Sequence, residues 1–183
     1  ADAEASFSRA LVIVEGACGT RAPETGAPLR NLALHLFARG ELDRAEPLLA
    51  RYIALVERAH DDDELLAETD ALLRPLEIYG YCLMLRGKFD AARDQYERTL
   101  RISRALHGGS STSPDPNVIQ SVRPLEQIGM VAFAAGNYDA ARARFKEAHD
   151  TLLFNGRGEF DVDVMRMCNN VAVATCKKGP GAF

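Results

Sequence analysis

The stretch RPLEQIGMVAFAAGNYDAARARFKEA, which runs from Arg123 to Ala148, decides the fold because the chain contains an earlier copy of it. RPLEIYG at 74–80 corresponds to RPLEQIG, and GKFDAAR at 87–93 corresponds to GNYDAAR, both at an offset of 49 residues. One offset aligns both pairs of segments. An internal repeat at this spacing is typical of proteins built from stacked supersecondary units.

Each copy contains two apolar helical patterns separated by a turn of the form x-Gly-x-aromatic-Asp. In the later copy Leu125 and Ile128 mark the first helix face and Phe145 marks the second, at the three-to-four spacing of one helix side. Gly129 and Ala141 are small enough for the two helices to cross closely. Helices with such narrow apolar stripes cannot bury them alone, so the sequence predicts stacked helix pairs.

This pattern resembles the tetratricopeptide repeat, in which a large apolar residue and an apolar-Gly pair are followed by Ala with an aromatic residue four positions on. Gly40 and Gly179 mark two more turns beside Gly87 and Gly136, and the turn glycines lie 47, 49 and 43 residues apart. The standard period is about 34 residues. The resemblance implies an all-α, right-handed superhelical solenoid of antiparallel helix pairs, with about three full repeats and partial terminal ones.

The long units resemble those of the kinesin light chain family. The motifs that carry this resemblance are NLAL at 31–34, AEPL at 45–48 and DVDVMRMCNNVAVA at 161–174. Two units depart from the family pattern, because Glu77-Ile78 and Glu126-Gln127 stand where the family has a pair of asparagines. The resemblance implies an adaptor or scaffold role.

We expect a single domain over residues 1–183. Its predicted parts are a second helix of a preceding or capping unit at 1–18, unit 1 at 27–58, unit 2 at 62–106, unit 3 at 117–154, and the first helix of unit 4 at 161–179. Residues 61–64 are expected to open a helix, residues 107–116 to form a loop, and Asp161 or Asp163 to cap the last helix.

Composition excludes several classes of function. The chain has 183 residues, 47% of them hydrophobic, a net charge of −4 and a pI near 5.6, so it lacks the basic footprint of a nucleic-acid-binding protein. No apolar run reaches the roughly 20 residues needed to insert across a membrane, and no secretion signal is recognisable. We expect a cytoplasmic protein.

The sequence offers no signs of catalysis or of a cofactor. It has no Gly-rich phosphate loop, no G-x-S-x-G and no H-E-x-x-H motif. Its four cysteines form no CxxC pair and no metal-binding cluster with histidine. Two of them, Cys82 and Cys168, are expected to fill apolar helix faces. The prediction is a protein that is not an enzyme, with no cofactor and no metal.

The resemblance further implies that the first helix of each pair lines a concave groove and contacts a peptide from fixed positions before the turn glycine. The candidate residues are, thirteen positions before it, Arg74, Arg123 and Arg166; ten before it, Arg30, Glu77, Glu126 and Asn169; nine before it, Asn31, Gln127 and Asn170; and six before it, Leu34, Tyr81 and Met130. The arginines could hold carboxylates or phosphates of a ligand, or they could pair with nearby Glu77 and Glu126.

The amides in this set could bond the backbone of an extended peptide, and the apolar residues could be anchors or core. Leu34 and Ile78 occupy the places of the two asparagines with which chaperone-type repeats hold a C-terminal carboxylate, so recognition of chaperone tails is not predicted. The sequence predicts a protein-interaction module that binds a peptide of a partner in this groove. The alternative is a structural module that self-associates, or packs within a larger chain, through its open terminal helices.

Overall fold

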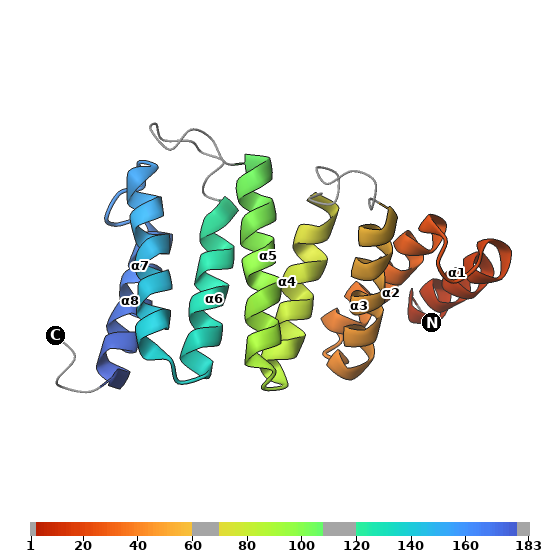
Figure 1. The fold of residues 1–183 in the computed structure, drawn as a ribbon, viewed down its shortest axis with the longest axis horizontal. Helices are drawn as coiled ribbons and strands as arrows, with labels where there is room; N and C mark the ends of the chain where they lie inside the picture. The colour runs from red at the N-terminus through yellow and green to blue at the C-terminus, as the bar shows by residue number, and fades with distance from the viewer. Residues whose placement is uncertain (1–2, 60–69, 108–119, 179–183) are drawn as a thin grey trace. The chain divides into compact units, whose positions relative to one another are not determined.

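The computed structural model describes residues 3–59, 70–107 and 120–178, which form eight α-helices and one short 3₁₀ helix (Figure 1). In chain order these are α1 (Ala3–Cys18), η1 (Pro23–Thr25), α2 (Gly26–Ala38), α3 (Leu42–Ala59), α4 (Asp70–Leu85), α5 (Phe89–His107), α6 (Val122–Ala134), α7 (Tyr138–Phe154) and α8 (Val162–Lys178). The helices pack as sequential antiparallel pairs, which confirms the predicted all-α fold class. The segment predicted at 61–64 lies outside the described residues, and so does the loop predicted at 107–116 except for His107, which is the last residue of α5.

The chain divides into two compact bodies, residues 1–82 and 83–183, with the division inside α4. They are called here the N-terminal body and the C-terminal body. The single domain over residues 1–183 stays a prediction.

In the N-terminal body α1 packs on α2, and α2 packs on α3. Ala33, Leu49, Ile78 and Cys82 form a buried cluster that joins α2, α3 and α4. Burying such side chains is worth about 1.5–3 kcal/mol for each large aliphatic residue. Cys82 therefore acts as the small apolar core residue that the sequence predicted.

In the C-terminal body α6 packs on α7, and α7 packs on α8. The close crossing predicted at Gly129 is confirmed, since a Cβ atom built there would lie 2.5 Å from the Phe145 ring. Phe145 also packs with Ala141 and with Ala174 of α8 in one buried cluster. The prediction for Cys168 is wrong, because this residue of α8 is exposed.

Four helices end in the same backbone geometry. Gly40, Gly87, Gly136 and Gly156 have φ between 72° and 79°, a left-handed conformation that favours glycine. At each one the amide of the next residue bonds a carbonyl five positions back, and the glycine amide bonds one three positions back. These bonds make a Schellman cap. Three of the glycines are the predicted turn residues; the fourth, Gly156, ends α7 at a link between units. The predicted turn at Gly179 lies outside the described residues.

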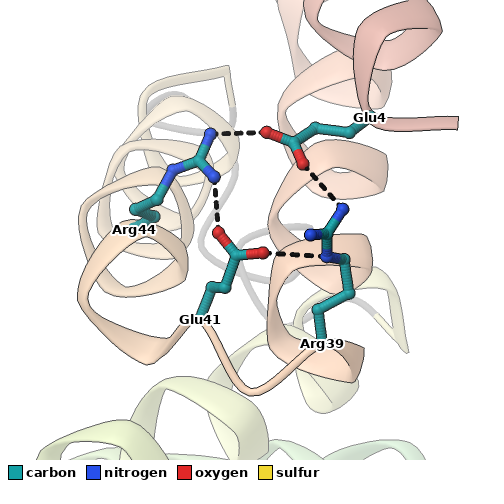
Figure 2. A network of polar contacts seen from close by, with 4 residues as sticks. All are labelled: Glu4, Arg39, Glu41 and Arg44. Atoms are coloured by element: carbon teal, nitrogen blue, oxygen red, sulfur yellow. Dashed lines mark hydrogen bonds and ion pairs between the residues drawn. The ribbon is translucent and has the colours of Figure 1, made fainter. Parts of the chain in front are cut away.

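The turn between α2 and α3 is enclosed by four charged side chains, named here the ion ring (Figure 2). Glu4 of α1 binds Arg44 Nη2 at 2.6 Å and Arg39 Nη1 at 3.0 Å. Glu41 closes the ring by binding Arg39 Nε at 2.8 Å and Arg44 Nη1 at 2.5 Å. The hydrogen bond from Arg44 lowers the pKa of the Glu4 carboxyl group below its ordinary value. The ring ties the first turn of α1 to the turn that follows α2.

The start of α8 is fixed by one of the two predicted capping residues. Asp161 Oδ1 accepts a hydrogen bond of 2.9 Å from the backbone N–H of Asp163. This hydrogen bond lowers the pKa of the Asp161 carboxyl group, and an ion pair with Arg157 at 3.1 Å adds to the effect. Asp161 is therefore the cap, and Asp163 is left to pair with a side chain of α8.

Candidate functional site

The predicted groove residues of the N-terminal body lie on α2 and α4. Asn31 is exposed, Arg30 is half-buried, and Leu34 is half-buried against the core cluster. On α4, Arg74 Nη1 lies 3.2 Å from Glu77 Oε2, so this arginine is paired within its own helix. The structure thus bears out the pairing alternative for Arg74.

Tyr81 links the two helices of this set. Its ring is 38% exposed and meets the edge of the Phe37 ring, with centroids 6.0 Å apart and planes at 84°. Such edge contacts add about 0.5–1.5 kcal/mol to the burial of the two rings. Sequence reasoning missed Phe37, although it lies three positions after Leu34 on the same side of α2. The contact holds Tyr81 in place while part of its ring stays open to solvent.

In the C-terminal body Glu126 joins two helices. Its Oε1 atom lies 3.0 Å from Arg166 Nε and accepts a hydrogen bond of 3.4 Å from Asn170 Nδ2. Arg166 also binds Asp163 at 2.9 Å. Three predicted residues from α6 and α8 are therefore brought together, and Asp163 was missed although its spacing of three from Arg166 is a helix-pair signal.

The remaining predicted residues of this body differ in exposure. Arg123, Met130 and Asn169 are exposed, and Gln127 is half-buried. They lie on the same two helices as the Glu126 network. The structure describes the two bodies separately, so a groove that runs across both stays a prediction.

One repeat position exposes an apolar side chain in successive units. Tyr81, Met130 and Val173 lie six positions before the turn glycine and are 38%, 41% and 41% exposed. Ile78, three positions before Tyr81, is only 4% exposed and belongs to the core. The apolar stripe of these helices therefore has a buried part and an outward part, and only the outward part can meet a ligand.

Sequence comparison identifies the repeats. Residues 26–51 and residues 82–115 each match the tetratricopeptide repeat family. The chain contains tetratricopeptide repeats. Tetratricopeptide repeats are generally protein-interaction modules and not catalytic domains, which agrees with the general class predicted from the sequence. No curated protein matches the chain.

Solved structures share this tetratricopeptide-repeat fold. Two crystal structures of the nearly identical TPR-like repeats of a Podosopora anserina kinesin light chain-like protein, one of them a variant, superpose with TM-scores of 0.74 and 0.73 at 15% and 16% identity. Both alignments cover 94% of this chain and 76% of the other. BtubC (BKLC) from P. vanneervenii superposes with a TM-score of 0.62 at 19% identity, over 96% of this chain and 65% of that one. These matches place the fold in the TPR-like solenoid class.

The described residues contain neither a metal-binding cluster nor a membrane-spanning helix. Within residues 3–59, 70–107 and 120–178, no group of three or more His, Cys, Asp or Glu side chains is placed to hold a metal ion. In the same ranges every helix is too short or too polar to span a lipid bilayer.

Proposed function

We propose that the protein binds an extended segment of a partner protein along the outward faces of its first helices, α2, α4, α6 and α8. The observation that carries this proposal is the exposed apolar residue at one repeat position, Tyr81, Met130 and Val173. An apolar side chain gains about 25 cal/mol for each Å² that a ligand removes from water. Side chains that recur at one repeat position suit a ligand that contacts successive units.

Polar groups beside these anchors fit the backbone and the charges of a peptide. Asn31 and Asn169 are exposed amides that can both donate to and accept from a peptide backbone. The pairs Arg74–Glu77 and Arg166–Glu126 are partly exposed, and such pairs contribute about 0–1 kcal/mol. A ligand carboxylate can therefore displace the glutamate at little cost, and each arginine is already oriented by its partner.

The named structural neighbour supports a particular biological role. The Podosopora anserina repeats are described as kinesin light chain-like. We extend this to the present chain as an adaptor or scaffold role, in which the bound segment belongs to another protein.

The test compares two matched double variants. Peptides that bind the wild-type protein are selected from a library of random linear peptides. The best binder is then labelled, and its affinity is measured by fluorescence anisotropy. Tyr81→Ser with Met130→Ser should weaken binding by about tenfold or more, because two apolar anchors are lost. The control, Leu106→Ser with Leu153→Ser, removes two apolar side chains of similar exposure from the second helices α5 and α7 and should leave the affinity unchanged. Equal affinity of the first variant and the wild type would contradict the proposal.

A second function rests on a different observation, the exposed apolar pair on α1. Val12 is 67% exposed and Ile13 is 59% exposed, side by side on the first helix. The proposal is that this pair packs on a second copy, so the protein self-associates through a terminal helix. The test is sedimentation velocity. The wild type should form an oligomer, and the double variant Val12→Ser with Ile13→Ser should not. A wild type that stays monomeric at every concentration would rule it out.

A further inference from the structure

An open pocket of about 330 Å³ lies in the N-terminal body where the link after α1 meets α3. Its walls are formed by Thr20, Arg21, Arg51, Ala54, Leu55 and Arg58. The four residues from α3 are spaced at three and four positions and therefore share one helix face. The link after α1 adds the third arginine. This arginine pocket is separate from the outward faces of the first helices.

One of the three arginines is held by the protein itself. Arg51 Nη2 lies 2.5 Å from Glu15 Oε1 and donates a hydrogen bond of 2.7 Å to the Thr20 carbonyl oxygen. These contacts fasten α3 to the end of α1 and fix the direction of the guanidinium. Arg51 therefore contributes an oriented positive charge that is partly neutralised by Glu15.

The other two arginines of the pocket, Arg21 and Arg58, lie at its exposed rim. Arg21 and Arg58 are exposed and form no ion pair with any residue in the described ranges. Two guanidinium groups at the rim of one pocket repel each other unless an anion lies between them. The sum over the pocket is three positive charges against the single carboxylate of Glu15. The pocket is therefore suited to an anion with more than one charge.

A mostly apolar pocket, with Arg30 of α2 on one wall, adjoins the first one and shares Leu55 with it. This second pocket, about 260 Å³, is also lined by Tyr52 and Val56 of α3 and by Gly26 of α2. A Cβ atom at Gly26 would lie 3.2 Å from Leu55 Cδ2, so the absence of a side chain there lets α2 approach α3. A ligand that places an anion among the arginines can place an apolar group against Leu55 and Tyr52.

We propose that the arginine pocket binds a phosphoryl group carried by a serine or threonine of a partner protein. A phosphoryl group has a charge of about −1.5 to −2 and three acceptor oxygens, so it can use several guanidinium groups at once. Arginine binds such oxygens in a bidentate manner. A single carboxylate would satisfy only one arginine and leave the others unpaired. The neighbouring apolar pocket would receive an apolar residue next to the phosphorylated one.

The net charge favours a phosphopeptide over an anionic membrane as the ligand. The chain has a net charge of −4, which disfavours approach to a negative lipid surface.

The test uses the chain of residues 1–183 and defined probes. A pool of peptides with phosphoserine at the centre and random flanking residues is compared with the same pool carrying serine, and with inorganic phosphate as competitor. The wild type should retain phosphopeptides at least about tenfold better than serine peptides, and phosphate should compete. Arg21→Gln with Arg58→Gln should abolish this preference. Circular dichroism should show unchanged folding, because neither side chain forms an ion pair within the part of the chain that the structure describes.

A matched control separates a specific site from general charge. Arg9→Gln with Arg142→Gln removes the same charge from α1 and α7, outside the pocket, and should change phosphopeptide binding less than about twofold. Three outcomes would overturn the proposal. Phosphopeptide binding could fall equally in both double variants, the protein could bind inorganic phosphate but none of the phosphopeptides, or it could bind only vesicles that contain phosphoinositides. Failure here would leave the peptide test on Tyr81 and Met130 unaffected, since that surface shares no residue with the pocket.

Discussion

The hairpins α2–α3 and α6–α7 have the same turn and different helix crossings. Seven positions before the turn glycine the first hairpin has Ala33 and the second has Gly129; nine positions after it they have Leu49 and Phe145. All four residues belong to the interior. In α6–α7 the larger side chain, Phe145 on the second helix, faces a glycine on the first helix. The comparison teaches that the repeat conserves the space between the helices, and not the residue on either one.

The same two hairpins hold their turns from outside in different ways. The α2–α3 turn is enclosed by the ion ring, and its contacts are electrostatic. At the α6–α7 turn, Phe133 and Tyr138 meet edge to face with centroids 5.3 Å apart, and Asn137 caps α7 by accepting a hydrogen bond from the Ala140 amide. Both hairpins thus have the same backbone turn, and the side chains around it determine how the stability of each turn depends on salt and pH.

The largest effect is expected from importing the alanine of one hairpin into the other. Gly129→Ala places a methyl group 2.5 Å from the Phe145 ring and should lower the free energy of unfolding by about 1–3 kcal/mol. Denaturant unfolding followed by circular dichroism measures the change.

The second half of this test restores the pairing found in α2–α3. Adding Phe145→Leu to Gly129→Ala should recover part of the lost stability, so the double variant should be more stable than the sum of the single effects predicts. The control is Ala33→Gly, which creates no clash and should cost about 1 kcal/mol. Strictly additive single effects would show that the two positions do not compensate.

The next effect should be equal in both hairpins. Gly40→Ala and Gly136→Ala each force an alanine into a left-handed conformation, at a cost of about 1–2 kcal/mol, and neither new Cβ would have an atom within 4 Å. Thermal unfolding of the two variants should therefore shift by similar amounts. A large difference between them would mean that the ion ring or the aromatic contact, and not the glycine, determines the turn.

A smaller effect should be confined to one hairpin. Asn137→Ala removes the side-chain acceptor of the α7 cap and should cost about 1 kcal/mol. Asn137→Asp keeps an acceptor and should retain nearly all of the stability. Chemical denaturation of both variants provides the measurement, and equal losses would indicate that the cap hydrogen bond contributes nothing.

The smallest effect should come from the ion ring, and it should depend on pH. The pKa of Glu4 is lowered in the folded state by its hydrogen bond from Arg44, so the stabilisation is present above the unfolded-state pKa and is lost as pH falls through the folded-state value. The melting temperature of Glu4→Gln should lie slightly below that of the wild type at pH 7, and the difference should vanish in acid or in high salt. A difference that persists in acid would assign the effect to packing of α1.

The sequence predicts the helices and three turn glycines well because the same apolar pattern and the same turn glycine occur in more than one repeat. Gly129 was expected at a close crossing because a larger side chain there would hold the two helices apart, and the structure shows that the residue it meets is Phe145. The cap at Gly156 could not be predicted in this way, because the x-Gly-x-aromatic-Asp pattern in this link, RGEFD at 157–161, is centred on Gly158 and not on Gly156. Its backbone geometry is visible only in the structure.

Contacts between distant residues were less accessible to sequence reasoning. The Glu126–Arg166 pair joins residues forty positions apart, and the sequence left open whether Arg166 would pair or stay available. The arginine pocket joins Arg21 to Arg51 and Arg58 across a link whose path no periodicity describes. Exposure of Cys168 was also missed, because an apolar period indicates that a helix has a buried face but not how much of that face its neighbours cover.

The cap at Gly156 has a consequence for how a chain of this kind can lengthen. Since α7 ends at a link between units with the same two hydrogen bonds that end the helices inside hairpins, a gene segment copied from one such glycine to the next encodes its own complete helix ending. An in-frame duplication with its boundaries at these codons keeps a Schellman cap at the end of the helix on each side of the copied segment. The two segments that recur at one offset of 49 residues are what such a duplication would leave in the sequence.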